Sequence, residues 1–347
     1  MLGSGSTLAS CSSDEIGRYI CGVVNAEDLV RLAHSRWVIA SGANGPGVPA
    51  GQLFLINAKT REAKAILPLP DSRFRHHPEL YAECSDKPQQ DKFVAGGINV
   101  RRTGERRYTL YVVHHGERES VEIFDIDARG ARPELTWVGC VQMPSRPDSN
   151  QPWLPNAVTS LPDDAFAVTV NPAPDPADPA YLEKLISGQI KGLVLVWSPR
   201  HGWREVLGSE LAGNNGIESS PDGRWLYVNA SFEPAVHRLS LAPGHADHRV
   251  IPTTFNPDNL RWGDDGLLYV AGPTDHVQEA LLCAATQPSC AIPYKVVRID
   301  PRTLTVDELI DEPGSAVFGL ATGVAKVGNE VWVSTVRGTR IATFPLE

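Results

Sequence analysis

The chain has 347 residues, of which 42% are hydrophobic and 21% charged, and its formal net charge is −9. An acidic balance argues against a nucleic-acid partner, because such partners are bound mainly by Lys and Arg side chains that neutralise phosphates. The apolar runs, such as residues 192–197, have the length of a strand and fall far short of the roughly 20 residues of a membrane-spanning helix, so no membrane span is expected.

Short β-rich segments recur along the chain, separated by turns rich in Pro, Asp and Gly. The clearest unit runs from Asn215 to Ser220, turns at Pro221-Asp-Gly223, and continues through Trp225–Asn229. Six such units can be aligned, and their first strands begin near residues 27, 97, 156, 215, 258 and 322. A repeat of roughly 40–70 residues is typical of one four-stranded propeller blade with insertions.

The sequence therefore predicts an all-β fold, a six-bladed β-propeller, with one domain over residues 21–347 and an N-terminal extension over residues 1–20. A β-sandwich could be built from the same hairpins. It is disfavoured because nothing in a sandwich requires each hairpin to begin with the same polar-then-apolar signature.

Polar residues open four of the six units, where the first strand of a blade should line the central channel. Buried carboxylates and amides are costly unless they are paired or bind a cation, and calcium accepts mixed oxygen ligands of this kind. Each residue alone could instead cap a turn. As a set they predict one calcium site, formed by Glu27, Asn156, Asn215, Asp258 and Asn259. The carboxylates of Glu27 and Asp258 would balance part of the charge of the ion.

Hairpin direction brings the second strand of each unit back to the face where the first strand began. The strand Leu110–Val113 should therefore end near the predicted metal, at His114 and His115. His115 is the candidate general base, and the alternative is an ordinary hydrogen-bonded histidine. The same face should carry three long excursions, Ser41–Gln52, Pro172–Lys191 and Pro273–Tyr294.

Two of these excursions are expected to contain short helices on the metal-site face. In the second, Asp178 is the predicted N-cap and Pro179 lies in the first turn. Apolar helical faces would either shape a hydrophobic substrate pocket or pack onto the propeller rim. The apolar residues concerned are Leu182, Leu185 and Ile186 in the second excursion and Val277, Leu281 and Leu282 in the third.

Six cysteines occur without a CxxC pair or a nearby histidine partner, which favours disulfides over zinc. Cys283 and Cys290 flank a proline-containing loop that a bridge could close. Disulfides predict a periplasmic or secreted protein. The alternative is a cytoplasmic protein with six buried free thiols.

Several of these phrases together resemble the paraoxonase/arylesterase family and the wider senescence-marker/gluconolactonase propeller superfamily. They are Asn25–Leu29, Leu110–Gly116 with Glu119–Phe124, Asn215–Ile217 with Ser220–Gly223, and Pro257–Leu260. In that family a Glu, two Asn and an Asp-Asn pair hold a catalytic calcium. The resemblance therefore carries the same role to Glu27, Asn156, Asn215, Asp258 and Asn259.

The sequence departs from the family pattern at two places. A second, structural calcium of the family would use Asp28 and the carbonyl of Ile98, but Ala157 stands where an acid is needed. We therefore expect one catalytic ion, with an incomplete match for a second. The second histidine of the family's catalytic pair matches His115, whereas the first falls at Gly96.

The resemblance implies a calcium-dependent hydrolase that opens a lactone or cleaves an ester. Calcium would polarise the carbonyl and water would be the nucleophile, with His115, Glu27 or Asp258 as the proton acceptor. The expected substrate is a small molecule with apolar bulk, and the expected state is a monomer or weak oligomer. The alternatives are a calcium-dependent lyase or isomerase and a non-catalytic binding propeller with a structural calcium.

Overall fold

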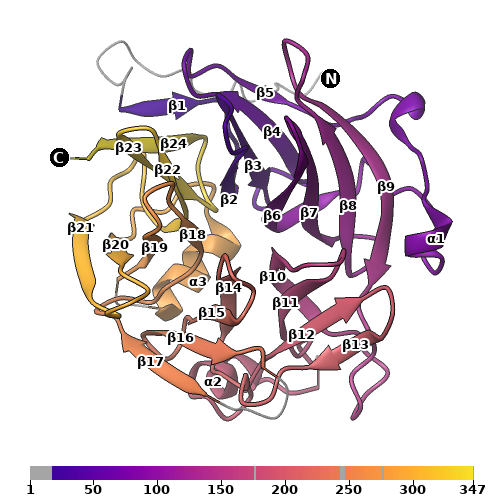
Figure 1. The fold of residues 1–347 in the computed structure, drawn as a ribbon. Coiled ribbons are helices and arrows are strands. Elements are labelled where there is room, and N and C mark those ends of the chain that lie inside the picture. Colours follow the sequence, from indigo (N-terminus) through magenta and orange to yellow (C-terminus); the bar gives the residue numbers. More distant parts are fainter. Residues whose placement is uncertain (1–17, 176, 243–246, 275–276, 347) are drawn as a thin grey trace, which may run out of the picture.

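The computed structural model describes residues 18–175, 177–242, 247–274 and 277–346. These residues form six four-stranded antiparallel sheets arranged around a central axis (Figure 1). The predicted six-bladed β-propeller is therefore confirmed. Within each blade the first strand lies at the axis and the last at the rim, except in the sixth blade, whose outer strand comes from the N-terminal part of the chain.

The blades follow one another in chain order. Blade 1 consists of β2 (Ala26–Arg31), β3 (Trp37–Gly42), β4 (Gln52–Asn57) and β5 (Ala63–Ala65). Blade 2 consists of β6 (Val94–Gly104), β7 (Arg107–His115), β8 (Ser120–Asp127) and β9 (Glu134–Gln142). Blade 3 consists of β10 (Leu154–Ser160), β11 (Phe166–Asn171), β12 (Leu193–Ser198) and β13 (Gly202–Glu205).

The second half repeats the arrangement. Blade 4 consists of β14 (Asn214–Ser219), β15 (Trp225–Ala230), β16 (Ala235–Ser240) and β17 (His248–Pro252). Blade 5 consists of β18 (Leu260–Trp262), β19 (Leu268–Pro273), β20 (Tyr294–Ile299) and β21 (Val306–Glu312). Blade 6 consists of β22 (Ala321–Val327), β23 (Glu330–Thr335), β24 (Arg340–Pro345) and β1 (Tyr19–Cys21).

Strand β1 closes the ring by pairing antiparallel with β24, with Ile20 opposite Ile341. The two ends of the described chain therefore belong to the same blade, and their pairing holds the first and last repeats together. Tyr19 and Ile20 belong to the propeller although they fall within the expected extension, and residues 1–17 lie outside the described part.

The core lies between neighbouring blades, where the apolar faces of two sheets pack together. Leu53 of blade 1 and Trp137 of blade 2 belong to one buried cluster, and Tyr111 of blade 2 and Phe166 of blade 3 belong to the next. Alternation along each strand directs every second side chain toward one of these layers. The blades are therefore fixed relative to one another, and so are the residues that they present at the axis.

The helical segments are short: η1 (Asp71–Arg73), α1 (Pro78–Tyr81), α2 (Tyr181–Ile186) and α3 (Val277–Thr286). Helix α2 begins later than predicted, and its N-cap is Ala180, not Asp178. The Asp178 carboxylate instead accepts hydrogen bonds from the Ala180 backbone N–H at 3.1 Å and from Lys184 Nζ at 2.9 Å. These contacts form a turn before the helix.

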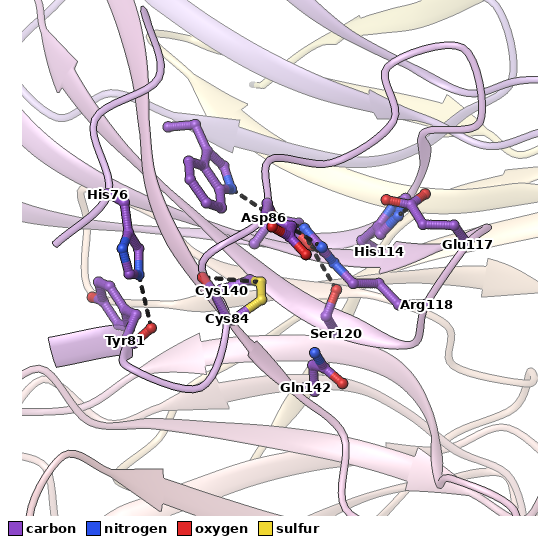
Figure 2. The surroundings of a disulfide bond; sticks show 12 residues. His76, Tyr81, Cys84, Asp86, His114, Glu117, Arg118, Ser120, Cys140 and Gln142 are labelled. Carbon is purple, nitrogen blue, oxygen red and sulfur yellow. Dashed lines mark hydrogen bonds and ion pairs between the residues drawn. A yellow bond between two sulfur atoms is a disulfide. The ribbon is translucent and has the colours of Figure 1, made fainter. Parts of the chain in front are cut away.

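Two disulfides join described cysteines, Cys84 to Cys140 and Cys283 to Cys290. The second is the bridge predicted from the sequence, while the first ties the connection between blades 1 and 2 to strand β9 (Figure 2). None of the described cysteines is free. None of the helices within the described ranges is long and apolar enough to cross a membrane.

Candidate metal centre at the channel mouth

Five of the six inner strands carry a β-bulge near their first residues. Pairing with the next strand is interrupted at Glu27, at Gly96-Gly97, at Asn156-Ala157, at Asn215-Gly216 and at Thr322-Gly323. In the remaining blade, Asp258-Asn259 lie just before regular pairing begins at Leu260. A bulge lifts a residue out of the ladder and can re-aim its side chain. All five predicted ligands therefore occupy positions outside the regular pairing.

Hydrogen bonds bring together four of the five predicted ligands, from blades 1, 4 and 5. Asn259 Nδ2 lies 2.8 Å from Glu27 Oε1 and 3.3 Å from Asp258 Oδ1. The Asn215 side chain is hydrogen-bonded to Asp258. The predicted ligands from these three blades thus form one continuous cluster.

Asn156 lies on β10 of blade 3, and Thr169 joins this strand to blade 4. The Thr169 hydroxyl accepts from the Ala157 backbone N–H at 3.0 Å and donates to the Asn215 carbonyl at 2.6 Å. Gly97 completes the contact on the other side: a Cβ there would lie 2.6 Å from Ala157 Cα, so only glycine allows the two inner strands this close.

The three predicted amide ligands share one feature. Each has a buried side-chain oxygen with no hydrogen-bond partner, Asn156 Oδ1, Asn215 Oδ1 and Asn259 Oδ1, and the same holds for Oδ1 of Asn171 and Asn229, which are not predicted ligands. An unsatisfied buried polar atom costs about 1–3 kcal/mol, so each of these oxygens calls for a partner. A cation fits, because amide oxygens are acceptors and have no proton to offer it.

The two carboxylates of the cluster ionise with difficulty in the absence of a cation. Desolvation, and then the charge of Asp28, raises the pKa of Asp258 to about 8. Desolvation and the charges of Asp28 and Asp258 hold the pKa of Glu27 well above its usual value. A divalent cation bound between them would lower both pKa values, because it favours the charged form of each carboxyl group.

The composition of the cluster limits which metal it suits. In the part of the chain that the structure describes, no group of three or more His, Cys, Asp or Glu side chains is placed to hold a metal. The candidate set contains only two such residues, Glu27 and Asp258, and its other donors are amides. All five donors are oxygens, which suits calcium better than zinc or copper.

His115 lies beside this cluster, at the end of β7. A Cβ built on Gly96 would lie 3.4 Å from His115 Nε2 and 3.4 Å from the Asn156 carbonyl oxygen. The glycine that replaces the first histidine of the family pair therefore leaves space between the imidazole and the strand that carries a predicted ligand. The neighbouring His114 is fully buried and stacks on Phe93. We therefore assign His114 a structural role and not a catalytic one.

Glu119 fixes the orientation of the His115 ring. Its Oε2 atom lies 2.6 Å from His115 Nδ1, and because a carboxylate only accepts, this nitrogen carries the proton. Nε2, on the opposite side of the ring and toward Gly96, is then free to accept a proton. Sequence reasoning missed Glu119, although its position four residues after His115, across the β7–β8 turn, was a usable signal.

The turn that carries Glu119 is held by the loop that the Cys84–Cys140 disulfide attaches to blade 2 (Figure 2). Glu117 accepts from the Gln89 backbone N–H at 2.9 Å and contacts His114 Nε2 at 3.1 Å. Arg118 donates to the Asp86 carbonyl at 3.0 Å. The geometry of His115 and Glu119 therefore depends on a covalently anchored loop.

The long excursions leave their blades from the ends of β3, β11 and β19, the ends at which the inner-strand bulges lie. Arg337, in the β23–β24 turn, connects two of them by donating to the carbonyls of Asn44 and Ala284. Leu182 on α2 is 46% exposed and Leu282 on α3 is 66% exposed. Both leucines are therefore exposed on their excursions, and α3 packs onto the propeller through Ala280.

The sequence matches no family model and no curated protein. Solved structures do resemble it. A gluconolactonase from Xanthomonas campestris matches with a TM-score of 0.57 and 16% identity, over 95% of this chain and 88% of that one. A calcium-binding regucalcin from Agrobacterium tumefaciens matches with a TM-score of 0.52 and 11% identity, over 95% and 94%.

The chain has the fold of the gluconolactonase and regucalcin propellers. The same fold also occurs in virginiamycin B lyase from Staphylococcus aureus, which matches with a TM-score of 0.50 and 14% identity over 93% of this chain and 95% of that one. At these identities the likeness concerns the fold, and the activity has to be argued from the site.

Proposed function

We propose that this protein is a calcium-dependent hydrolase that opens a lactone or cleaves an ester. The observation that carries the proposal is the cluster of three unpartnered amide oxygens and two carboxylates, Glu27 and Asp258, beside the Glu119-oriented His115. The likeness in fold to a gluconolactonase and to a calcium-binding regucalcin supports this proposal.

In this proposal Glu27, Asn156, Asn215, Asp258 and Asn259 hold the ion. Calcium would supply a positive charge that polarises the carbonyl of the substrate. His115 Nε2 takes a proton from the attacking water, while Glu119 stabilises the imidazolium through Nδ1. The water oxygen adds to the carbonyl carbon, the C–O bond to the leaving alkoxide breaks, and the proton passes from Nε2 to that alkoxide. Glu27 and Asp258 are the alternative proton acceptors.

A calcium-dependent lyase or isomerase remains the rival activity, and a binding propeller with a structural calcium is the rival without catalysis. The reaction in H₂¹⁸O separates these classes. Hydrolysis places one ¹⁸O atom in the carboxylate product, elimination or isomerisation places none, and a binding module forms no product.

Chelation is the direct test of the metal's role. We expect activity toward a panel of lactones and aryl esters to disappear in EGTA and to return with added calcium. Magnesium should restore less, because it prefers a tighter octahedral set of ligands. Activity that survives full removal of divalent ions would contradict the proposal.

The raised pKa of Asp258 adds a pH dependence to calcium binding. Asp258 must lose its proton to bind the ion, so affinity should increase with pH up to about 8 and then level off. In the calcium-free protein the stabilisation from protonated Asp258 is complete below pH 3.8 and is lost as the pH rises through about 8. Calorimetric titrations between pH 6 and 9 would measure the affinity and the protons released.

The apolar side chains on the excursions predict a substrate with apolar bulk. None of the residues of α2 is buried, so deletion of Asp178–Gln189 should leave the propeller folded while it raises KM or changes substrate preference. The milder Leu182→Ser should raise KM for long-chain esters about 3- to 10-fold. Val250→Ser changes another exposed apolar residue, on the outer strand β17, and is the control. Global unfolding of the deletion variant would instead indicate that the excursion is needed for packing.

The two disulfides support a periplasmic or secreted protein, since such bonds persist in oxidising compartments. We further propose a monomer or weak oligomer that acts on a small molecule.

A further inference from the structure

An arginine lies across the central channel below the candidate metal centre. Arg261 belongs to β18, and its side chain is 5% exposed. Nε donates to the Leu29 carbonyl at 3.0 Å, and Nη1 donates to the Leu260 carbonyl at 2.7 Å and to Glu218 Oε1 at 3.1 Å. Nη2 contacts Asp28 Oδ2 and the Ile98 carbonyl. The guanidinium thus joins blades 1, 2, 4 and 5.

Two of these acceptors are the atoms at which the family resemblance would place a second calcium. Asp28 and the Ile98 carbonyl are brought together as that resemblance requires, and Asp28 Oδ2 also accepts from the Ile98 backbone N–H at 2.9 Å. Nη2 of Arg261 contacts both acceptors, however, and the third expected acid is replaced by Ala157. The residues present therefore do not fit a second metal ion.

The surroundings of Arg261 are complete without an ion. Its five N–H donors have five acceptors, contributed by two carboxylates and three backbone carbonyls. Asp28 Oδ1 is satisfied by the Leu29 backbone N–H at 2.7 Å. This contrasts with the centre above it, where three amide oxygens have no partner. The guanidinium of Arg261 fills the position between Asp28 and the Ile98 carbonyl, whereas the candidate metal centre calls for an ion.

We propose that Arg261 is a built-in cation that replaces a second metal ion, so that this propeller takes up a single divalent ion at its axis. The positive charge comes with the folded chain and does not depend on the calcium concentration. Calcium removal should therefore empty the upper centre while the inner strands stay joined through Arg261. This inference concerns metal content and stability, and it does not require the proposed hydrolase activity.

The first test is the metal content of the unaltered protein. Equilibrium dialysis against ⁴⁵Ca after chelation should give one tightly bound equivalent per chain. Asp258→Ala should reduce this number to none, because the remaining axial position is held by Arg261. Two equivalents in the unaltered protein, or one left in Asp258→Ala, would overturn the proposal.

The second test separates charge from shape. Arg261→Lys keeps the positive charge and Arg261→Gln removes it, while both lose part of the hydrogen bonding. Arg261→Gln leaves Asp28 and Glu218 without a counter-charge, so its Tm without calcium should fall by about 10 °C, and Arg261→Lys should lose less than half of that. Arg302→Gln, an exposed arginine in the β20–β21 turn of the same blade, should change Tm little. Equal losses in the Lys and Gln variants would show that the residue acts through its shape and not as a cation.

Discussion

Replacement of Asp258 by alanine is expected to remove calcium and activity together. Asp258 lies in contact with Asn259 and Asn215. Its loss therefore removes one ligand and also removes a contact that orients the side chains of the two asparagines. It also supplies one of only two negative charges in the ligand set. We expect kcat/KM to fall about 10³-fold or more and the calcium affinity to fall at least about 100-fold.

In the absence of calcium, Asp258→Ala should not lower the stability of the protein. Burial disfavours the charged form of Asp258 when no ion is present, so alanine removes a group that is difficult to ionise at neutral pH. Asp258→Ala should therefore be no less stable than the calcium-free parent in thermal unfolding above pH 8. It should lack the stabilisation that calcium gives the parent.

Two further variants make this result specific. Asp258→Asn keeps an oxygen donor without the charge, and it should bind calcium with an affinity between the parent and Asp258→Ala. Asp307→Ala removes an exposed carboxylate from the outer strand β21 of the same blade and should leave binding and activity unchanged. Full activity in Asp258→Ala would exclude Asp258 from the site.

Replacement of His115 by glutamine is expected to lower kcat at least tenfold, because a positioned general base is typically associated with about 10²–10⁴-fold in rate. Calcium affinity should stay nearly unchanged, since His115 is not among the expected ligands. The reason is geometric: Glu119 holds the proton on Nδ1 and leaves Nε2 facing the space above Gly96. Steady-state kinetics and calcium titration of the same preparation measure the two quantities separately.

Glu119 provides the companion measurement. Glu119→Gln should lower kcat with little effect on KM, because it weakens the orientation and charge stabilisation of the ring. In a double-mutant cycle, Glu119→Gln should have almost no further effect on kcat when His115 is already replaced by glutamine. Additive losses would indicate that Glu119 acts independently of His115. A fall in kcat of less than threefold in His115→Gln would assign proton transfer to Glu27 or Asp258.

The repeated hairpin signature was sufficient to predict the six-bladed propeller and the inner strands. Its physical basis is local, because alternation of apolar residues and the Pro-Asp-Gly turns act within about 20 residues of chain. The same signature pointed to Glu27, Asn156, Asn215, Asp258 and Asn259, since each lies at the equivalent place in its repeat. Their assignment as metal ligands stays a prediction, which the structure supports through the unpartnered amide oxygens.

The remaining features of the site depend on residues far apart in the chain. Arg261 looks in sequence like any strand residue, and its pairing with Asp28 and the Ile98 carbonyl arises only when three blades meet at the axis. The bulges that re-aim the ligands are likewise visible only in the strand register. Sequence alone thus determined the repeat and the residues offered to the channel, because those are set by local periodicity. Tertiary structure decided which of the offered charges are neutralised within the chain and which oxygens are left for an ion, because that depends on distances between blades.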